Sequence, residues 1–319
     1  FRKYNYIFYL FDYIQNTLVS LHIFHFFAYI FYMISFKVFK FNYKKILIVL
    51  ILLLAHIFPL ILVHNFSFAK NDDSIALPIV MYHSLLKSKS GNYIVHPATF
   101  ENDLKYIQDK RYTTITMTDL INYVYKNSPL PEKPIIITFD DGFYNNFGYA
   151  VPLLHKYDMK AVISIVGKYT DTYSKSDEAN LNYSYLRWKD INDLMQDGCI
   201  EFQNHTYNLH STSKRQGSKK LPYESVSAYA DVFTNDLLKL QDEFEKNCNG
   251  YKPNTFTYPL GAVSKDSIPL IKELGFKASL SCTSGVNYIT KNPECLYLLK
   301  RNNRVGSMST ERFFSKLLK

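Results

Sequence analysis

Short apolar runs alternate with amphipathic segments along residues 77–319. The apolar runs predict strands at 77–83, 134–139, 161–166, 200–205, 255–259, 278–283 and 296–301. The amphipathic segments predict helices at 97–110, 117–126 (with Thr118 as a cap), 147–157, 188–197, 222–247 and 264–274. Because short strands separated by helices are typical of βα units, the pattern predicts an α/β fold with a parallel sheet. Seven strands of this kind predict a distorted (β/α)7 barrel, in which the carboxyl ends of the strands meet on one face.

Two longer apolar runs precede this alternation. Residues 46–63 carry no formal charge, and at ~1.5 Å per residue they would span roughly 27 Å, enough for a transmembrane helix or signal anchor. Residues 17–36 are also uncharged and are a candidate first transmembrane helix within an N-terminal segment, 1–45, whose role is open. Residues 64–76 are polar and are expected to link this region to a domain at 77–319.

The basic residues indicate the orientation of the predicted anchor. Of the formal net charge of +9, residues 1–69 contribute +5 through six Lys or Arg and one Asp. Lys37, Lys40, Lys44 and Lys45 precede the second apolar run, so the positive-inside rule predicts a cytoplasmic start and an extracellular domain. A start at Met33 would leave one basic region and one apolar helix, with the same orientation.

Two adjacent carboxylates follow one of the predicted strands. The apolar run 134–137 continues into Thr138-Phe139-Asp140-Asp141-Gly142, so both carboxylates lie at the strand end. Two like charges this close are unfavourable unless a cation or a shared proton separates their roles. One Asp could bind a metal while its neighbour acts as a base. The alternative is an ordinary Asp-Asp-Gly turn that ends a strand.

Two histidines follow another predicted strand. His205 ends the strand at 200–205, and His210 lies in the loop after it. With Asp141 they would form a two-His, one-carboxylate set that leaves open positions for water and substrate, as a catalytic metal site requires. Histidines in such a loop can equally be solvated without any metal.

Together these motifs resemble the polysaccharide deacetylase family, also called the NodB-homology or carbohydrate esterase family 4 domain. Residues 138–142 match the family's Thr-Phe-Asp-Asp-Gly motif, and His205, Thr206 and His210 match its His-Ser/Thr motif with a second His downstream. The five-residue histidine spacing, where four is common, looks like the branch that deacetylates poly-N-acetylglucosamine in biofilms. The resemblance covers roughly residues 76–315.

The resemblance implies a role for each matched residue. Asp141, His205 and His210 would bind a divalent metal, for which zinc is expected and cobalt or nickel are alternatives. Asp140 would take a proton from a water that the metal activates. In the biofilm branch an early Met-Tyr-His supplies the general acid, and His83 matches it. Taken alone, His83 ends an apolar strand and would titrate near neutrality, or be a half-buried core histidine.

The third family motif, an Arg before Pro-Tyr-Gly, is only partly kept. In the corresponding run, 256–261, Leu260 replaces Tyr and no Arg is present. A backbone N–H at Leu260 would still stabilise the oxyanion, because the side chain is not the donor. Tyr258 is a further candidate for substrate binding, and Arg301 is a candidate to orient Asp140. Trp188 would either line the sugar cleft or pack at a helix start.

Composition narrows the remaining function classes. With 47% hydrophobic and 20% charged residues the chain can form a large core, and disorder is not expected. No arginine-rich stripe indicates nucleic acid; the basic pairs at 214–215 and 219–220 are expected to be a solvated face, with contact to an anionic cell-wall polymer as a less favoured alternative. Cys199 is expected to be a buried thiol, and a bridge between Cys282 and Cys295 is not required.

The motifs and the resemblance predict a metal-dependent hydrolase that removes N-acetyl groups from N-acetylglucosamine units of a cell-surface polysaccharide. Poly-β-1,6-N-acetylglucosamine fits the histidine spacing, and peptidoglycan is the other candidate polymer. The expected location is the cell membrane, with the catalytic domain on the extracellular side. Two alternatives stay open: a catalytically impaired relative that binds carbohydrate, and a metal-dependent amidase that acts on a non-polymer substrate.

Overall fold

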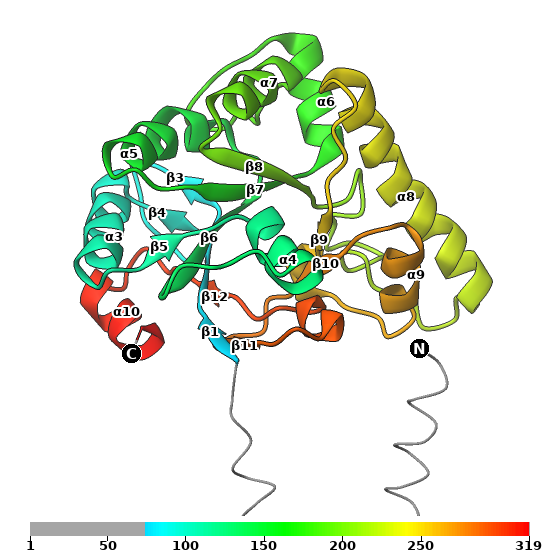
Figure 1. Ribbon diagram of the computed structural model, residues 1–319. Helices are drawn as coiled ribbons and strands as arrows, with labels where there is room; N and C mark the ends of the chain where they lie inside the picture. The colour runs from blue at the N-terminus through cyan, green and yellow to red at the C-terminus, as the bar shows by residue number, and fades with distance from the viewer. Residues whose placement is uncertain (1–73, 319) are drawn as a thin grey trace, which may run out of the picture. The chain divides into compact units, whose positions relative to one another are not determined.

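A curled parallel sheet forms the centre of residues 74–318, the part of the chain that the computed structural model describes (Figure 1). Its strands are β2 (Ile79–Tyr82), β5 (Thr113–Thr114), β6 (Pro134–Asp141), β7 (Ala161–Ile165), β8 (Ile200–Asn204), β9 (Thr255–Thr257), β10 (Ala278–Leu280) and β12 (Asn302–Asn303). They are ordered β10-β9-β8-β7-β6-β2-β12, with β5 paired to β6 beside this path. Every one of these pairings is parallel. The predicted α/β fold with a parallel sheet is confirmed.

Two small sheets flank the large one. β1 (Ile75–Leu77) pairs antiparallel with β11 (Asn287–Ile289), and β3 (Ser84–Leu85) pairs parallel with β4 (Ile94–Val95). Of the predicted strand at 77–83, β2 forms the main part, because Pro78, which lacks an N–H, separates it from the end of β1, and β2 stops before His83.

The predicted strand at 296–301 is wrong. Residues Pro293–Leu296 form a 3₁₀ turn, and Leu298 has a left-handed backbone (φ 59°) that interrupts any extended run. The segment that follows contacts both edges of the sheet. The Leu299 N–H donates to the carbonyl of Ser279 (2.8 Å) in β10, and the Arg304 N–H donates to the carbonyl of Met81 (2.9 Å) in β2.

Helices surround the curled sheet, and most of them lie on its outside (Figure 1). They are α3 (Pro97–Asp109), α4 (Met117–Lys126), α5 (Val151–Lys156), α6 (Gly167–Ser176), α7 (Trp188–Asp197), α8 (Val226–Asn247), α9 (Ser267–Glu273) and α10 (Thr310–Leu317). Thr116, not Thr118, caps α4, since its hydroxyl accepts the Asp119 N–H while the Asp119 carboxylate accepts the Thr116 N–H. The sequence did not predict α6 or α10. Most of α6 is polar, and only Gly167 and Thr170 are buried in it.

The two faces of the central strands bury different residues. Ile135, Ile137 and Phe139 of β6 pack into the cluster under the outer helices, while Ile136 packs into a second cluster with α4. Further along the inner face of β6, the side chains become polar, at Thr138 and Asp140, although both are buried. Buried polar side chains therefore gather at the carboxyl end of the sheet, where a site can form.

Several sequence predictions concern residues outside the described range. The apolar runs 17–36 and 46–63, and nearly all of the linker 64–76, lie outside residues 74–318. Within 74–318, no helix combines the length and apolar character that a bilayer crossing needs.

Cys199 is a buried free thiol as predicted, and Cys282 and Cys295 are both free.

Candidate metal and catalytic site

The end of β6 turns two adjacent carboxylates toward one site. Asp141 has a left-handed backbone (φ 73°), and so does Gly142 (φ 76°). A Cβ at position 142 would lie 2.9 Å from Cγ2 of Ile165, so only glycine fits there. This departure from strand geometry explains how Asp140 and Asp141 both face the site, although side chains normally alternate along a strand. Both carboxylates are buried.

His205 follows β8 with its ring held in a fixed orientation. Its Nδ1 lies 2.8 Å from the backbone carbonyl of Thr257 and donates to it, because a carbonyl can only accept. The nitrogen that faces Asp141 is therefore Nε2, at 3.6 Å from Oδ1. Thr206 then adopts a left-handed backbone (φ 74°), which turns the chain toward His210.

His210 completes a cluster with Asp141 and His205. Its Nε2 lies 3.0 Å from Asp141 Oδ1, and the donor atoms of the three residues are all within 4.8 Å of one another. Burial opposes the imidazolium form of His210, but the Asp141 carboxylate outweighs it and raises the pKa of His210. The structure brings together the three residues that the motifs predicted as ligands.

The donor set fits a divalent cation. Asp141 Oδ1 is buried and has no well-aligned hydrogen-bond donor, which leaves an orphaned anionic acceptor between two imidazole nitrogens. Two imidazoles and one carboxylate are ligands typical of zinc and similar ions. A second group, His155, Asp197 and Cys199, lacks this feature, because Asp197 Oδ1 already interacts with His155 Nε2 (2.8 Å) and the Cys199 N–H (3.3 Å).

Arg301 binds the other carboxylate, Asp140. Its Nη1 and Nη2 donate to Asp140 Oδ1 and Oδ2 at 2.6 and 2.8 Å, and its Nε donates to the carbonyl of Ser281 at 2.9 Å. Both side chains are almost fully buried. Burial alone would raise the pKa of Asp140, but the Arg301 charge and hydrogen bonds outweigh it and hold that pKa below its usual value. Asp140 is therefore ionised and fixed in orientation.

His83 lies beside the two carboxylates with a free ring nitrogen. Its Nδ1 is buried without a hydrogen-bond partner among residues 74–318. Burial lowers the pKa of His83, and the charges of Asp140 and Asp141 oppose this shift. The histidine is thus close enough to interact with both carboxylates, and one nitrogen remains available to a ligand.

The remaining predicted residues occupy different environments. Leu260 is 42% exposed in a short turn, with a left-handed backbone (φ 58°). Tyr258 is buried, with its hydroxyl 2.7 Å from Ser267 Oγ, so its side chain faces the core. Trp188 is also buried; its Nε1 donates to Asp171 Oδ1 (2.8 Å), and its ring packs edge-on against Phe244 (ring centroids 5.3 Å apart). Trp188 thus packs at a helix start rather than lining a cleft.

An aromatic cluster that was not predicted from the sequence lies beside the three candidate metal ligands. Tyr185 stacks on Phe143, with ring centroids 4.8 Å apart, and lies 4.5 Å from Tyr169. Tyr169 in turn lies 6.5 Å from the ring of His210. Burial, with a smaller contribution from Asp141, raises the pKa of Tyr185, so this phenol is uncharged. The only sequence signal was the high aromatic content, which is spread along the whole chain.

Comparison with known proteins agrees with these motifs. Residues 127–279 match the family described as polysaccharide deacetylase. Over these residues the chain is similar to the polysaccharide deacetylase family. Among curated members, it is 27% identical over 190 residues to the poly-β-1,6-N-acetyl-D-glucosamine N-deacetylase of Staphylococcus aureus strain MSSA476. That alignment covers 60% of this chain and spans about three fifths (61%) of the relative.

Solved structures share the fold of the described part of this chain. The Streptococcus pyogenes deacetylase PplD, in complex with acetate, has a TM-score of 0.62 and 22% identity, and the match covers 77% of this chain and all of that one. The IcaB structure from Ammonifex degensii has a TM-score of 0.60 and 20% identity, with 71% and 91% of the two chains covered. At these identities the likeness shows the fold alone.

Proposed function

We propose that this protein is a metal-dependent hydrolase that removes N-acetyl groups from N-acetylglucosamine units of a cell-surface polysaccharide. One observation carries the proposal: a cluster of Asp141, His205 and His210 suited to a cation, next to a separate carboxylate, Asp140, that Arg301 keeps ionised. The substrate printed in the name of the Staphylococcus aureus relative supports the same reaction class.

The two carboxylates have separate roles in this reaction. A divalent cation on Asp141, His205 and His210, with zinc as the expected ion, would supply Lewis acidity that polarises the acetamide carbonyl and lowers the pKa of a water. Asp140 accepts the proton of that water as it attacks. Arg301 keeps both Asp140 oxygens in place for this transfer, and its charge stabilises the carboxylate before the proton arrives.

His83 donates the proton that the departing amine needs. Its free Nδ1 and its position beside Asp140 and Asp141 support this role. The backbone N–H at Leu260 is proposed to stabilise the oxyanion, because the left-handed turn there leaves the residue exposed. The products are acetate and a glucosamine unit.

Arg301 also bears on the alternative of a catalytically impaired relative. That alternative arose because the third family motif lacks its arginine in this chain. A buried guanidinium on Asp140, supplied from the segment after β10, favours an active site instead. We interpret the curled sheet and its last segment, which bonds to both edges, as the distorted (β/α)7 barrel that the sequence predicted.

We further propose that the domain acts at the outer side of the cell membrane. The support is in the sequence: residues 46–63 carry no formal charge and follow the lysine-rich stretch 37–45. A polysaccharide of the cell surface would be accessible from that side. Fusing a periplasmic or cytoplasmic activity reporter after residue 76 tests this orientation, and reporter activity in the cytoplasm would overturn it.

The proposed function is tested by metal analysis of the purified full chain together with acetate release. Poly-β-1,6-N-acetylglucosamine, peptidoglycan and a small acetamide are the three substrates. We expect about one divalent ion per chain, acetate from at least one polymer, and loss of release after chelation with recovery on adding zinc. Release from the small acetamide alone would favour an amidase, and polymer binding without acetate would favour an impaired relative.

A further inference from the structure

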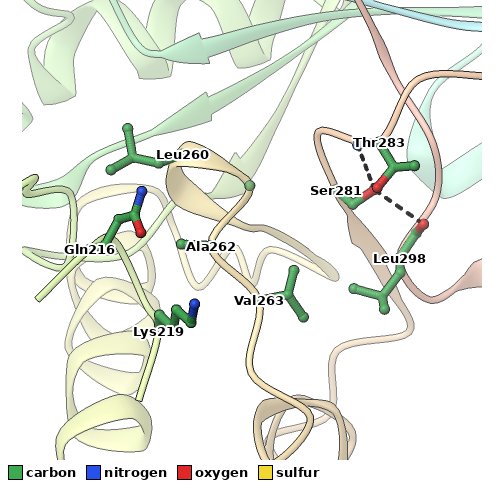
Figure 2. Close-up of a pocket in the computed structure, with 9 residues that line it drawn as sticks. Gln216, Lys219, Leu260, Ala262, Val263, Ser281, Thr283 and Leu298 are labelled. Atoms are coloured by element: carbon green, nitrogen blue, oxygen red, sulfur yellow. Dashed lines mark hydrogen bonds between the residues drawn. The ribbon is translucent and has the colours of Figure 1, made fainter. Parts of the chain in front are cut away.

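A cleft of about 370 Å³ opens beside the turn that carries Leu260 (Figure 2). Its volume lies at the small end of the ~300–1,000 Å³ typical of ligand sites, which suits a single sugar unit. Apolar side chains of Ala262, Val263 and Leu298 form part of the wall, and these can lie against the C–H face of a pyranose ring. Gln216, Lys219, Ser281 and Thr283 provide its polar side chains.

The cleft shares a wall with the catalytic site. Ser281 and Thr283 line the cleft, and Cys282 between them has its Sγ 3.9 Å from Nη2 of Arg301, the residue bound to Asp140. Gly261 of the cleft lies directly against this segment, because a Cβ there would be 2.8 Å from Cβ of Cys282. A polymer with one unit at Asp140 can therefore place the adjacent unit in the cleft.

The polar side chains of the cleft are free to bind a ligand. Gln216, Lys219 and Thr283 have no side-chain hydrogen bond or ion pair with any other residue of 74–318, whereas the Ser281 hydroxyl bonds to the carbonyl of Leu299 at 3.1 Å. No Asp or Glu lines the cleft in this part of the chain. Lys219 therefore brings a positive charge that the protein leaves unbalanced locally.

Neighbouring cations of the same loop differ from Lys219. Arg215 donates to Glu224 at 2.9 Å, and Lys220 lies 2.6 Å from Asp266. These two charges are neutralised by acids of the protein. Lys214 resembles Lys219 in lacking a described partner, but it does not line the cleft. The unpaired charge inside the cleft thus belongs to Lys219 alone among the residues described.

The loop that carries Lys219 is fixed against the Leu260 turn. Gly217 has a left-handed backbone (φ 53°), and a Cβ there would lie 2.6 Å from the carbonyl oxygen of Pro259. Ser218 donates from Oγ to the carbonyl of Ala262 at 3.2 Å, and Tyr229 donates to the carbonyl of Ser218 at 2.9 Å. The backbone of Lys219 is held beside the cleft, so only its side chain must be ordered on binding.

We propose that this cleft binds the sugar next to the one being deacetylated, and that Lys219 recognises a carboxylate on that sugar. The inference rests on the proposed deacetylase function and specifies its substrate class. The preferred glycan carries carboxyalkyl groups on alternating units, and a neutral homopolymer binds more weakly. Thr283 and Gln216 provide hydrogen bonds to the sugar hydroxyls or acetamide, and the apolar wall contacts the ring.

The test compares oligosaccharides of matched length on the full chain. The acidic substrate is a peptide-free tetrasaccharide of alternating N-acetylglucosamine and N-acetylmuramic acid; the neutral ones are the β-1,4 and β-1,6 tetramers of N-acetylglucosamine. We expect a lower KM for the acidic tetramer. Lys219→Gln should raise that KM by up to about fivefold, which is the effect expected from losing an exposed ion pair. The ratio of the acidic to the neutral KM should then approach one. Lys219→Arg should retain the preference.

Lys214→Gln is the matched control, because it removes the same charge from the same loop outside the cleft. It should leave the KM ratio as in the wild type, and the wild-type preference should shrink as ionic strength rises. Acetate release from neutral tetramers only, or an acidic-substrate KM that Lys219→Gln leaves unchanged, would overturn the inference while the deacetylase function stands. Acetate release from none of the substrates or polymers would instead overturn the proposed function.

Discussion

At the scale of single residues, the site gives two adjacent aspartates different partners. Asp140 binds a guanidinium in a bidentate manner, and Asp141 faces two imidazoles. Each carboxylate is compensated by positive charge or by donors suited to a cation, which resolves the repulsion between neighbouring like charges. The sequence identified the aspartates through their motif. Arg301 was only a candidate partner of Asp140, because no local sequence pattern indicates a contact between residues 161 positions apart.

Replacement of Asp140 by Asn should abolish turnover and preserve metal binding. The amide is nearly the same shape but cannot accept a proton, so we expect acetate release to fall by about 10²–10⁴-fold. Metal content, measured by elemental analysis, should stay at the wild-type value, since Asp141 and both histidines remain. His205→Ala is the comparison variant and should lose both the metal and activity. Normal turnover by Asp140→Asn would remove Asp140 from the mechanism.

Replacement of Arg301 by Gln should move the acidic limb of the pH–rate profile to higher pH. Arg301 holds the pKa of Asp140 below its usual value, so its loss lets burial raise that pKa. Asp140 would then be protonated, and inactive as a base, over more of the acidic range. The readout is kcat/KM from about pH 4 to 8. A purely structural role for Arg301 would lower the rate by the same factor at every pH, and Arg312→Gln, at an exposed arginine, provides a surface control.

At the scale of elements, α8 positions the loop between the candidate metal ligands His205 and His210. Asp236 of α8 accepts the N–H groups of Tyr207 (2.7 Å) and Asn208 (2.9 Å), between His205 and His210. Asn204 at the end of β8 donates to the carbonyl of Leu237 in the same helix (3.2 Å). Burial raises the pKa of Asp236 to about 6 despite these donors. The loop therefore depends on a carboxylate that is costly to ionise where it lies.

Asp236 should make stability fall as pH rises from about 4 to 6. Its pKa is about 6 in the folded chain and near 3.8 when unfolded, so over this range the folded state retains a proton that the unfolded state has lost. Above pH 6 both states are ionised and this contribution is constant. Relative to Asp236→Asn, the wild type should lose about 3 kcal/mol across the window. Chemical denaturation at several pH values measures the difference, and parallel curves for the two proteins would contradict it.

The sequence predicted elements where apolar periodicity was strong and failed where other forces decide. Helices α3, α4 and α7 begin and end within a residue of prediction, because each has a regular buried stripe and a clear start or stop. Helix α6 is nearly all polar and was missed. The strand at 296–301 was predicted from its apolar residues, but a left-handed Leu298 breaks it. The clustering of Asp141, His205 and His210 was predicted from their motif, whereas the cleft at Lys219 depends on tertiary contacts that no local pattern encodes.

At the scale of the whole described domain, the last segment ties the sheet together and carries the arginine of the site. Arg301 and Arg304 are both fully buried on this segment, three positions apart. Arg304 bonds to Asp103 of α3, with Nε to Oδ2 at 2.8 Å and Nη2 to Oδ1 at 3.0 Å. Tyr82 of β2 also donates to Asp103, at 2.8 Å. The ion pair therefore joins α3, the central sheet and the segment that places Arg301 on Asp140.

Breaking this buried pair from one side should destabilise the domain more than removing both partners. Arg304→Met leaves the Asp103 carboxylate buried without its cation, and such changes typically cost about 3–5 kcal/mol. Asp103→Leu combined with Arg304→Met removes the isolated charge and should recover part of that loss, although the Tyr82 hydroxyl then lacks its acceptor. Denaturant unfolding of the two variants gives the comparison.

Because Arg301 lies on the same segment, acetate release should fall in Arg304→Met under mild denaturant before the domain unfolds globally. Equal stability of the single variant and the wild type would show that the pair contributes nothing to holding this segment, and that other contacts fix Arg301.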